Sequence, residues 1–135
     1  MEIVLPLSVT LPRKTKADKI FALNLNIYRN THYLVLNQAK IAWKDIVEKT
    51  FWRSPFMLGD GPYRFTYTVY PASNRKFDIS NVCSIIDKFT CDALIEIGVI
   101  TDDSYKIIPS IDYRFGGVDK ENPRVELNIE SAGGA

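Results

Sequence analysis

The chain has 135 residues, a formal net charge of +1 and 46% hydrophobic residues. This length fits one compact domain, and the lack of a long uncharged apolar run argues against a segment that spans a membrane. A net charge this small would not attract polyanions, so binding to nucleic acid would have to use local clusters of basic residues.

The first half of the chain predicts one strand and one helix. Residues 2–10 are mostly apolar and are interrupted by Pro6, which predicts an edge strand. No basic region precedes this segment, so we do not expect a signal peptide. Residues 11–21 predict a polar, basic loop, and the Asn-rich residues 24–30 predict a turn. Apolar residues then recur at helical spacing, so we expect a helix over residues 34–49.

The second half predicts a helix between strands. Asp78 or Ser80 is expected to cap this helix and Gly98 to end it. Proline and glycine predict a connection over 53–62, and β-branched and aromatic residues predict a strand over 63–70. Periodicity predicts a helix over 80–97. We also expect strands over 106–115 and 124–129.

The order β–α–β–α–β–β predicts an α+β (α/β) fold, in which a mixed sheet of about four strands carries two main helices. We expect a single domain over residues 1–130 and a frayed tail over residues 131–135. The only two cysteines, Cys83 and Cys91, are too far apart on one helix for a disulfide. They predict reduced structural thiols in a cytosolic protein.

Periodicity divides the helix expected over residues 80–97 into two faces. The apolar face, which we expect to pack on the sheet, holds Val82, Ile86, Phe89, Ala93 and Ile97. The polar side holds Ser80, Ser84, Asp87, Lys88 and Cys91.

Acids stand at both ends of this helix: Asp78 precedes it, and Asp102 and Asp103 follow it. Carboxylates that converge without a positive partner repel one another and usually need a hard cation. If the loop after the helix folds back, these residues form a candidate Mg²⁺ site for phosphate chemistry. Asp78 could equally be a capping acid, and the other two could belong to a polar turn.

These residues resemble the RusA-like Holliday junction resolvases, a family common in phages and prophages. The resemblance covers most of the chain and implies a small, cytoplasmic, homodimeric endonuclease. Such an enzyme uses Mg²⁺, which Mn²⁺ can replace, to cut four-way junctions and other branched DNA during recombination, repair or phage DNA processing. The resemblance rests on Asp78-x-x-Asn81, on Lys88-x-x-x-Asp92-Ala93-Leu94 and on Gly98-x-x-x-Asp102-Asp103.

Residue by residue, the resemblance implies that Asp78 and Asp103 are catalytic acids that bind the metal ion, and that Lys88 is the essential lysine. Asn81 and Asp102 would support this site, Asn81 by orienting a ligand or the attacking water. For Asn81, an ordinary position at the start of a helix is the alternative.

The sequence departs from the family's pattern in two places. The family's Asp-x-Asp-Asn has an acid where this chain has Ser80, and the gap from Asn81 to Lys88 is four residues longer than in the family's form. Four residues are close to one helical turn, and Asp87 follows Ser80 along nearly the same side of the helix. We hypothesise that Asp87 is a catalytic residue and replaces the missing acid as a metal ligand. A salt-bridged surface acid is the alternative.

Basic residues gather in several clusters along the chain. Under the resemblance they would contact DNA phosphates, with binding that weakens as salt rises: Arg13, Lys14, Lys16, Arg29, Arg75 and Lys76. Two other functions stay open. One is a junction-binding module that kept the fold but lost the metal chemistry. The other is a structural or interaction protein whose acids only face solvent.

Overall fold

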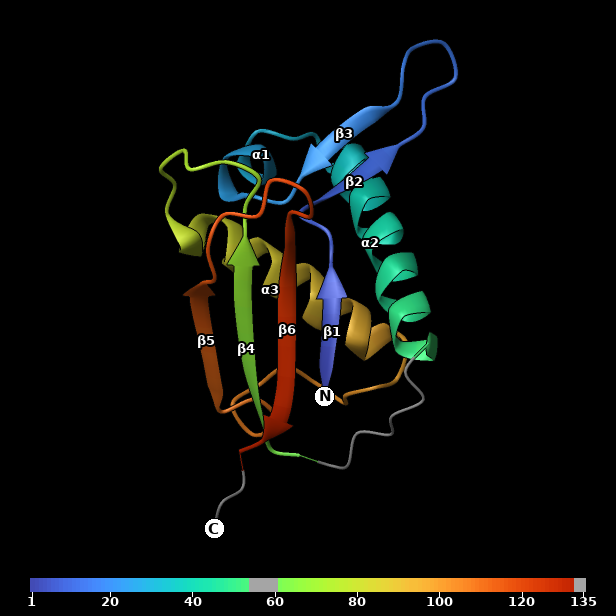
Figure 1. Ribbon diagram of the computed structural model, residues 1–135. Coiled ribbons are helices and arrows are strands. Elements are labelled where there is room, and N and C mark those ends of the chain that lie inside the picture. The colour runs from blue at the N-terminus through green and yellow to red at the C-terminus, as the bar shows by residue number, and fades with distance from the viewer. Residues whose placement is uncertain (54–60, 133–135) are drawn as a thin grey trace.

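The computed structural model, described for residues 1–53 and 61–132, contains a mixed four-stranded sheet with its two long helices on one face (Figure 1). The parallel pair is β4 with β5, whereas β6 runs antiparallel to both β4 and β1. This architecture confirms the predicted α+β fold. In spatial order the strands are β1 (Glu2–Leu5), β6 (Arg124–Ser131), β4 (Tyr63–Tyr70) and β5 (Ser110–Phe115).

The helical face of the sheet forms the core. In β4 the side chains of Phe65 and Tyr67 are fully buried, and the register places Tyr67 beside Leu127 of β6 and Tyr113 of β5. Alternate residues of a strand point to opposite faces of the sheet. Among residues 1–53 and 61–132, no helix lies on the opposite face (Figure 1), where Thr66 pairs with Asn128 of β6 and Asp112 of β5.

Helices α2 (Tyr33–Arg53) and α3 (Ile79–Glu96) cover the core. A buried hydrogen bond of 3.0 Å from Trp43 Nε1 to Thr90 Oγ1 joins them. Both helices confirm the predicted elements, with α2 longer by a few residues. None of the described helices is long and apolar enough to cross a membrane. Gly98, with a φ of 81°, follows α3 in the left-handed conformation that glycine adopts most easily.

The N-terminal segment differs from its prediction. The single strand expected over residues 2–10 is divided at Pro6 into β1 and β2 (Ser8–Leu11), and β2 pairs with β3 (Lys19–Ala22). The expectation of a loop throughout residues 11–21 was therefore wrong at both ends. The physical reason is that Leu11 and Phe21 are apolar and become buried when the hairpin closes.

The Asn-rich segment forms the short helix α1 (Leu25–Arg29) instead of a plain turn. Asn24 is its N-cap, since its Oδ1 accepts a 2.9 Å hydrogen bond from the Ile27 N–H. Further along, β5 begins only at Ser110, because the N–H groups of Ile107 and Ile108 both donate to Ser104 O in a turn. The predicted strand over 106–115 is correct only in its second part.

The ends of two predicted segments need correction. Arg53 belongs to α2, and most of the connection expected over 53–62 lies outside the described residues. Strand β6 extends to Ser131, which was expected in the tail, and the Ala132 N–H donates to Pro62 O at 2.9 Å. Residues 133–135 of the expected tail lie outside the described residues.

Candidate functional site

The three carboxylates expected to share one cation are spread along α3. Asp78 is the N-cap of this helix, Asp87 lies within it, and Asp103 follows its C-terminal end. At about 1.5 Å of rise per residue, Asp78 and Asp87 are separated by about 13 Å along the axis. Oxygen ligands of Mg²⁺ lie about 2.1 Å from the ion. In this arrangement Asp78 and Asp87 of one chain are too far apart to hold the same ion, and a role of Asp87 as a metal ligand stays a hypothesis.

In residues 1–53 and 61–132, no group of three or more His, Cys, Asp or Glu side chains is placed to hold one metal ion. The expected three-carboxylate Mg²⁺ site stays a prediction that these residues neither assemble nor exclude. Mg²⁺ is commonly held by one or two carboxylates together with water and the phosphates of a substrate. A site built on a single acid next to bound DNA would fit that smaller donor set.

Asp87 turns toward the sheet, away from the solvent-exposed side where Lys88 lies. Its Oδ1 accepts a 2.8 Å hydrogen bond from the Tyr67 hydroxyl and a 3.3 Å contact from Cys91 Sγ. Its Oδ2 accepts a 3.2 Å hydrogen bond from the Tyr113 hydroxyl. Both carboxylate oxygens of Asp87 are therefore engaged by donors from the sheet and from α3 itself.

The buried part of α3 is wider than its apolar positions predict. Cys83, Cys91 and Thr90 are buried although only apolar positions were expected to pack. The reason is that α3 contacts both the sheet and α2, so a second side of the helix is covered. Cys91 was expected on the polar side, and this expectation was wrong for the same reason.

Burial and the charge of Asp87 keep its neighbours protonated. Burial raises the pKa of Tyr67 and Tyr113, and the charge of Asp87 raises both further. The same two causes raise the pKa of Cys83 to about 11 and that of Cys91 still higher. At neutral pH the phenols and the Cys91 thiol are therefore donors to the Asp87 carboxylate.

The acids after α3 have separate environments. Asp102 Oδ1 accepts a 2.7 Å hydrogen bond from the Ser104 N–H. Hydrogen bonding to Ser104 lowers the pKa of Asp102, so this acid caps a turn. Asp103 is exposed, and its charge contributes to raising the pKa of Cys91. Asp103 is therefore electrostatically coupled to the middle of α3, whereas Asp78 lies at the opposite end of the helix.

An open groove of about 480 Å³ lies at the N-terminal end of α3, where the β4–α3 connection meets α1. We call it the α3 groove. Of the predicted site residues, it brings together Arg75, Lys76 and Asn81. Its lining consists of Asn24, Asn26, Ile27, Pro71, Ser73, Arg75, Lys76, Phe77, Asn81 and Val82.

Asp78 lies in the sequence between Phe77 and Asn81, which line the α3 groove, although Asp78 itself is not a lining residue. Its side chain is exposed and makes no capping hydrogen bond. Its backbone oxygen instead accepts a 3.0 Å hydrogen bond from the Asn81 N–H. The Asp78 carboxylate is thus not used in capping the helix, contrary to the alternative considered from the sequence.

Asn24, Asn26 and Ser73 also line the α3 groove, and the sequence does not predict that they meet there. The concentration of asparagines in residues 24–30 predicts a turn but does not by itself indicate a binding surface. Nothing in the sequence indicated that this segment would meet the β4–α3 connection almost fifty residues later.

The other predicted DNA contacts lie outside the α3 groove but at the same end of the molecule. Arg13, Lys14 and Lys16 are exposed on the turn between β2 and β3, and Arg29 is exposed in the last turn of α1. Figure 1 shows the β2–β3 hairpin, α1 and the β4–α3 connection together at one end of the sheet. These basic residues therefore lie at the end of the sheet that carries the α3 groove.

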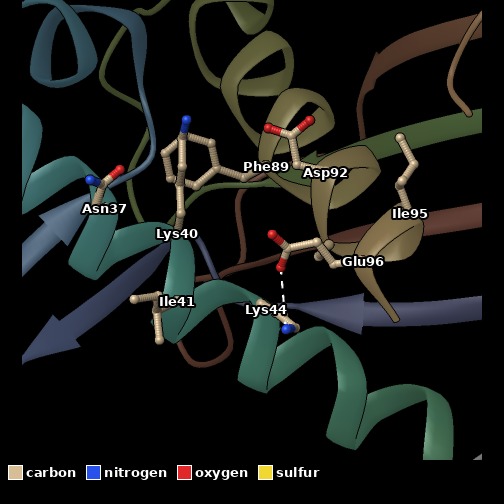
Figure 2. Close-up of a pocket in the computed structure, with 9 residues that line it drawn as sticks. Asn37, Lys40, Ile41, Lys44, Phe89, Asp92, Ile95 and Glu96 are labelled. Carbon is tan, nitrogen blue, oxygen red and sulfur yellow. Dashed lines mark ion pairs between the residues drawn. The ribbon is translucent and has the colours of Figure 1, made fainter. Parts of the chain in front are cut away.

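A second depression of about 520 Å³ lies between α2 and α3 (Figure 2). Lys44 Nζ pairs with Glu96 Oε2 at 3.3 Å, and Lys40 Nζ stands 5.8 Å from the ring centre of Phe89. Asp92, part of the motif that resembles the resolvases, also lines this depression. Its mixed and partly paired charges give it little attraction for a polyanion.

No protein-family model matches the chain, and no curated protein matches it. The resemblance to RusA-like resolvases therefore rests on the residues quoted above.

Proposed function

We propose that the protein is a Mg²⁺-dependent endonuclease that cuts Holliday junctions or other branched DNA. It would act as a homodimer in the cytoplasm of a bacterial or phage-infected cell, with Mn²⁺ able to replace Mg²⁺. The observation that carries this proposal is the α3 groove, in which Arg75 and Lys76 meet Asn24 and Asn26 at the end of α3 where the exposed Asp78 is the N-cap.

The chemistry of the α3 groove suits a nucleic-acid backbone. Arg75 and Lys76 supply positive charge for phosphates, and the asparagine amides can donate to phosphate or sugar oxygens. The groove lies at the N-terminus of α3, an 18-residue helix, whose free N–H groups favour an anion. Phe77 is 36% exposed at this groove and offers a ring on which an unpaired base can stack.

A metal ion would be held at this end of α3 by Asp78 and the Asn81 side chain, together with phosphate oxygens of the DNA. Such an ion supplies an activated water and neutralises charge on the phosphate. Lys88 lies about 15 Å from Asp78 along the helix axis, so we assign its exposed ammonium to a more distant phosphate. Asp103 is assigned to the same far region of α3.

The direct test is cleavage of a labelled four-way junction by the full chain with and without Mg²⁺. We expect Mg²⁺-dependent cleavage, which Asp78→Asn lowers by roughly 100-fold or more without abolishing junction binding. Asp45→Asn on α2 is the matched control, because this acid forms an exposed pair with Lys49 away from the groove, and it should cut like the wild type. Full activity of Asp78→Asn would show that Asp78 is not part of the active site.

A junction-binding module without metal chemistry is the second candidate function. The exposed Ser80, where the family's pattern has an acid, and the dispersed carboxylates favour it. Salt-sensitive binding of junction DNA, with no cleavage in Mg²⁺ or Mn²⁺, would establish this candidate over the nuclease.

A further inference from the structure

The edge strand β5 presents an unpaired edge with exposed apolar side chains. It is the last strand of the sheet, and in the described part of the chain no strand pairs with its outer edge. Phe115 is 54% exposed and Ile111 is 41% exposed, although both point to the face that the helices cover. Natural edge strands usually avoid such a combination because it invites pairing with another chain.

The residues of β5 alternate between the two faces of the sheet. Its register with β4 places Ile111, Tyr113 and Phe115 on the helical face, next to the buried side chains of β4. Asp112 and Arg114 lie on the open face, where their side chains form a 3.3 Å ion pair that is largely exposed. The strand thus carries two apolar and two oppositely charged residues placed symmetrically about Tyr113.

We propose that β5 of one copy pairs antiparallel with β5 of a second copy, about a two-fold axis at Tyr113. In this register Ile111 of each copy lies opposite Phe115 of the other on the helical face. Asp112 lies opposite Arg114 on the open face. The interface is isologous, as in most homodimers, and it joins the two sheets into one.

Charge selects this register over its neighbours. Moving the two-fold axis to Asp112 would place two aspartates opposite each other, and moving it to Arg114 would place two arginines opposite each other. Like charges in directly opposed positions destabilise an antiparallel pair, whereas opposite charges stabilise it. The surface is therefore self-complementary in charge and apolar contact only when Tyr113 is at the axis.

The proposed interface lies next to the buried cluster on α3. Tyr113 at the axis is the residue whose hydroxyl donates to Asp87 Oδ2, so the two α3 helices would flank the axis on the same side of the joined sheet. A junction has approximate two-fold symmetry, and such a dimer would present two symmetric α3 grooves to it. The inference rests on the homodimer of the proposed function, but it does not require cleavage.

The experiment measures the mass of the full chain against concentration by sedimentation. We expect a dimer for the wild type, and weakening by about tenfold or more for Asp112→Arg and for Arg114→Asp, because each places like charges opposite one another. The double variant D112R/R114D reverses both charges and should restore dimerisation to near the wild-type level. A double variant as weak as the single ones would overturn the register.

A second pair of variants tests the apolar contact without changing charge. Phe115→Ser should weaken the dimer, whereas Val118→Ser should not, because Val118 is similarly exposed at 47% but lies beyond the strand. Circular dichroism establishes that each variant is folded. A wild type that stays monomeric, or a Phe115→Ser variant that dimerises like the wild type, would overturn the proposal.

The junction-cleavage assay separates this inference from the proposed function. A dimer that depends on β5 but does not cut DNA would support the proposed interface and contradict the proposed nuclease activity. A monomer that cuts junctions in Mg²⁺ would support the nuclease activity and contradict the proposed interface.

Discussion

The hydroxyl of Tyr67 donates a 2.8 Å hydrogen bond to Asp87 and thereby ties the central strand β4 to α3. Tyr67 is fully buried, so this carboxylate is the partner its hydroxyl needs in the core. Asp87 is thus a packing element of the fold, and its role differs from that of Asp78 at the end of the same helix.

The contacts of Asp87 predict a clear effect on stability. Asp87→Ala should lower the free energy of unfolding by about 2 kcal/mol or more, because it leaves the buried Tyr67 hydroxyl without an acceptor. Tyr67→Phe should cost about 1 kcal/mol, since it removes the donor and keeps the ring. Urea unfolding measures both. Tyr105→Phe is the control, because Tyr105 is 76% exposed, and it should match the wild type.

The buried thiols and phenols predict a loss of stability in alkaline solution. Burial and the charge of Asp87 raise the pKa of Cys83 from 9.0 to about 11. The unfolded chain releases this proton from pH 9, while the folded chain keeps it until about pH 11. The stabilisation is therefore complete below pH 9 and falls between these two values.

Tyr67 and Tyr113, whose pKa values are also raised, extend this fall above pH 10. Urea midpoints measured between neutral pH and pH 10 under reducing conditions would show the loss, and Cys83→Ala should make it shallower. Equal midpoints across this range would contradict the raised pKa values.

The thiols should also be poorly reactive in the folded protein. A pKa two units above normal leaves Cys83 with about 100-fold less thiolate at neutral pH, and both cysteines are buried. A disulfide reagent should therefore label two thiols quickly in urea but slowly in the native protein. Rapid labelling of the native chain would place at least one cysteine at the surface.

The α3 groove predicts a salt-dependent loss of DNA affinity. Arg75→Ala or Lys76→Ala should weaken binding to a four-way junction and reduce the slope of log K against log salt by about 0.9 each. Fluorescence anisotropy at several salt concentrations gives this slope. Lys49→Ala on α2 is the matched control, because Lys49 forms an exposed pair with Asp45. An equal effect of all three variants would mean that DNA binding is not confined to the α3 groove.

Much of the fold could be predicted because the segments that form the core have clear strand or helix patterns in the sequence. The segment 63–70 is β-branched and aromatic and forms β4 with the predicted bounds. Helix α3 begins and ends within one residue of its expected limits, since Asp78 and Gly98 mark its two ends. The hairpin of β2 and β3 was missed because each strand has only four residues, and the polar, basic residues between them dominate the segment.

The sequence by itself determined the two long helices and the strands β4 and β6, the acids at the two ends of α3 and the basic clusters. Only the tertiary structure decided which of these residues meet. Asp87 was expected on the polar side of the helix as a substitute metal ligand, but packing on two sides of α3 turned its carboxylate to Tyr67 and Tyr113. The α3 groove likewise joins Asn24 to Arg75. Periodicity describes one helix or strand at a time, whereas such contacts depend on how distant elements bury their surfaces against each other.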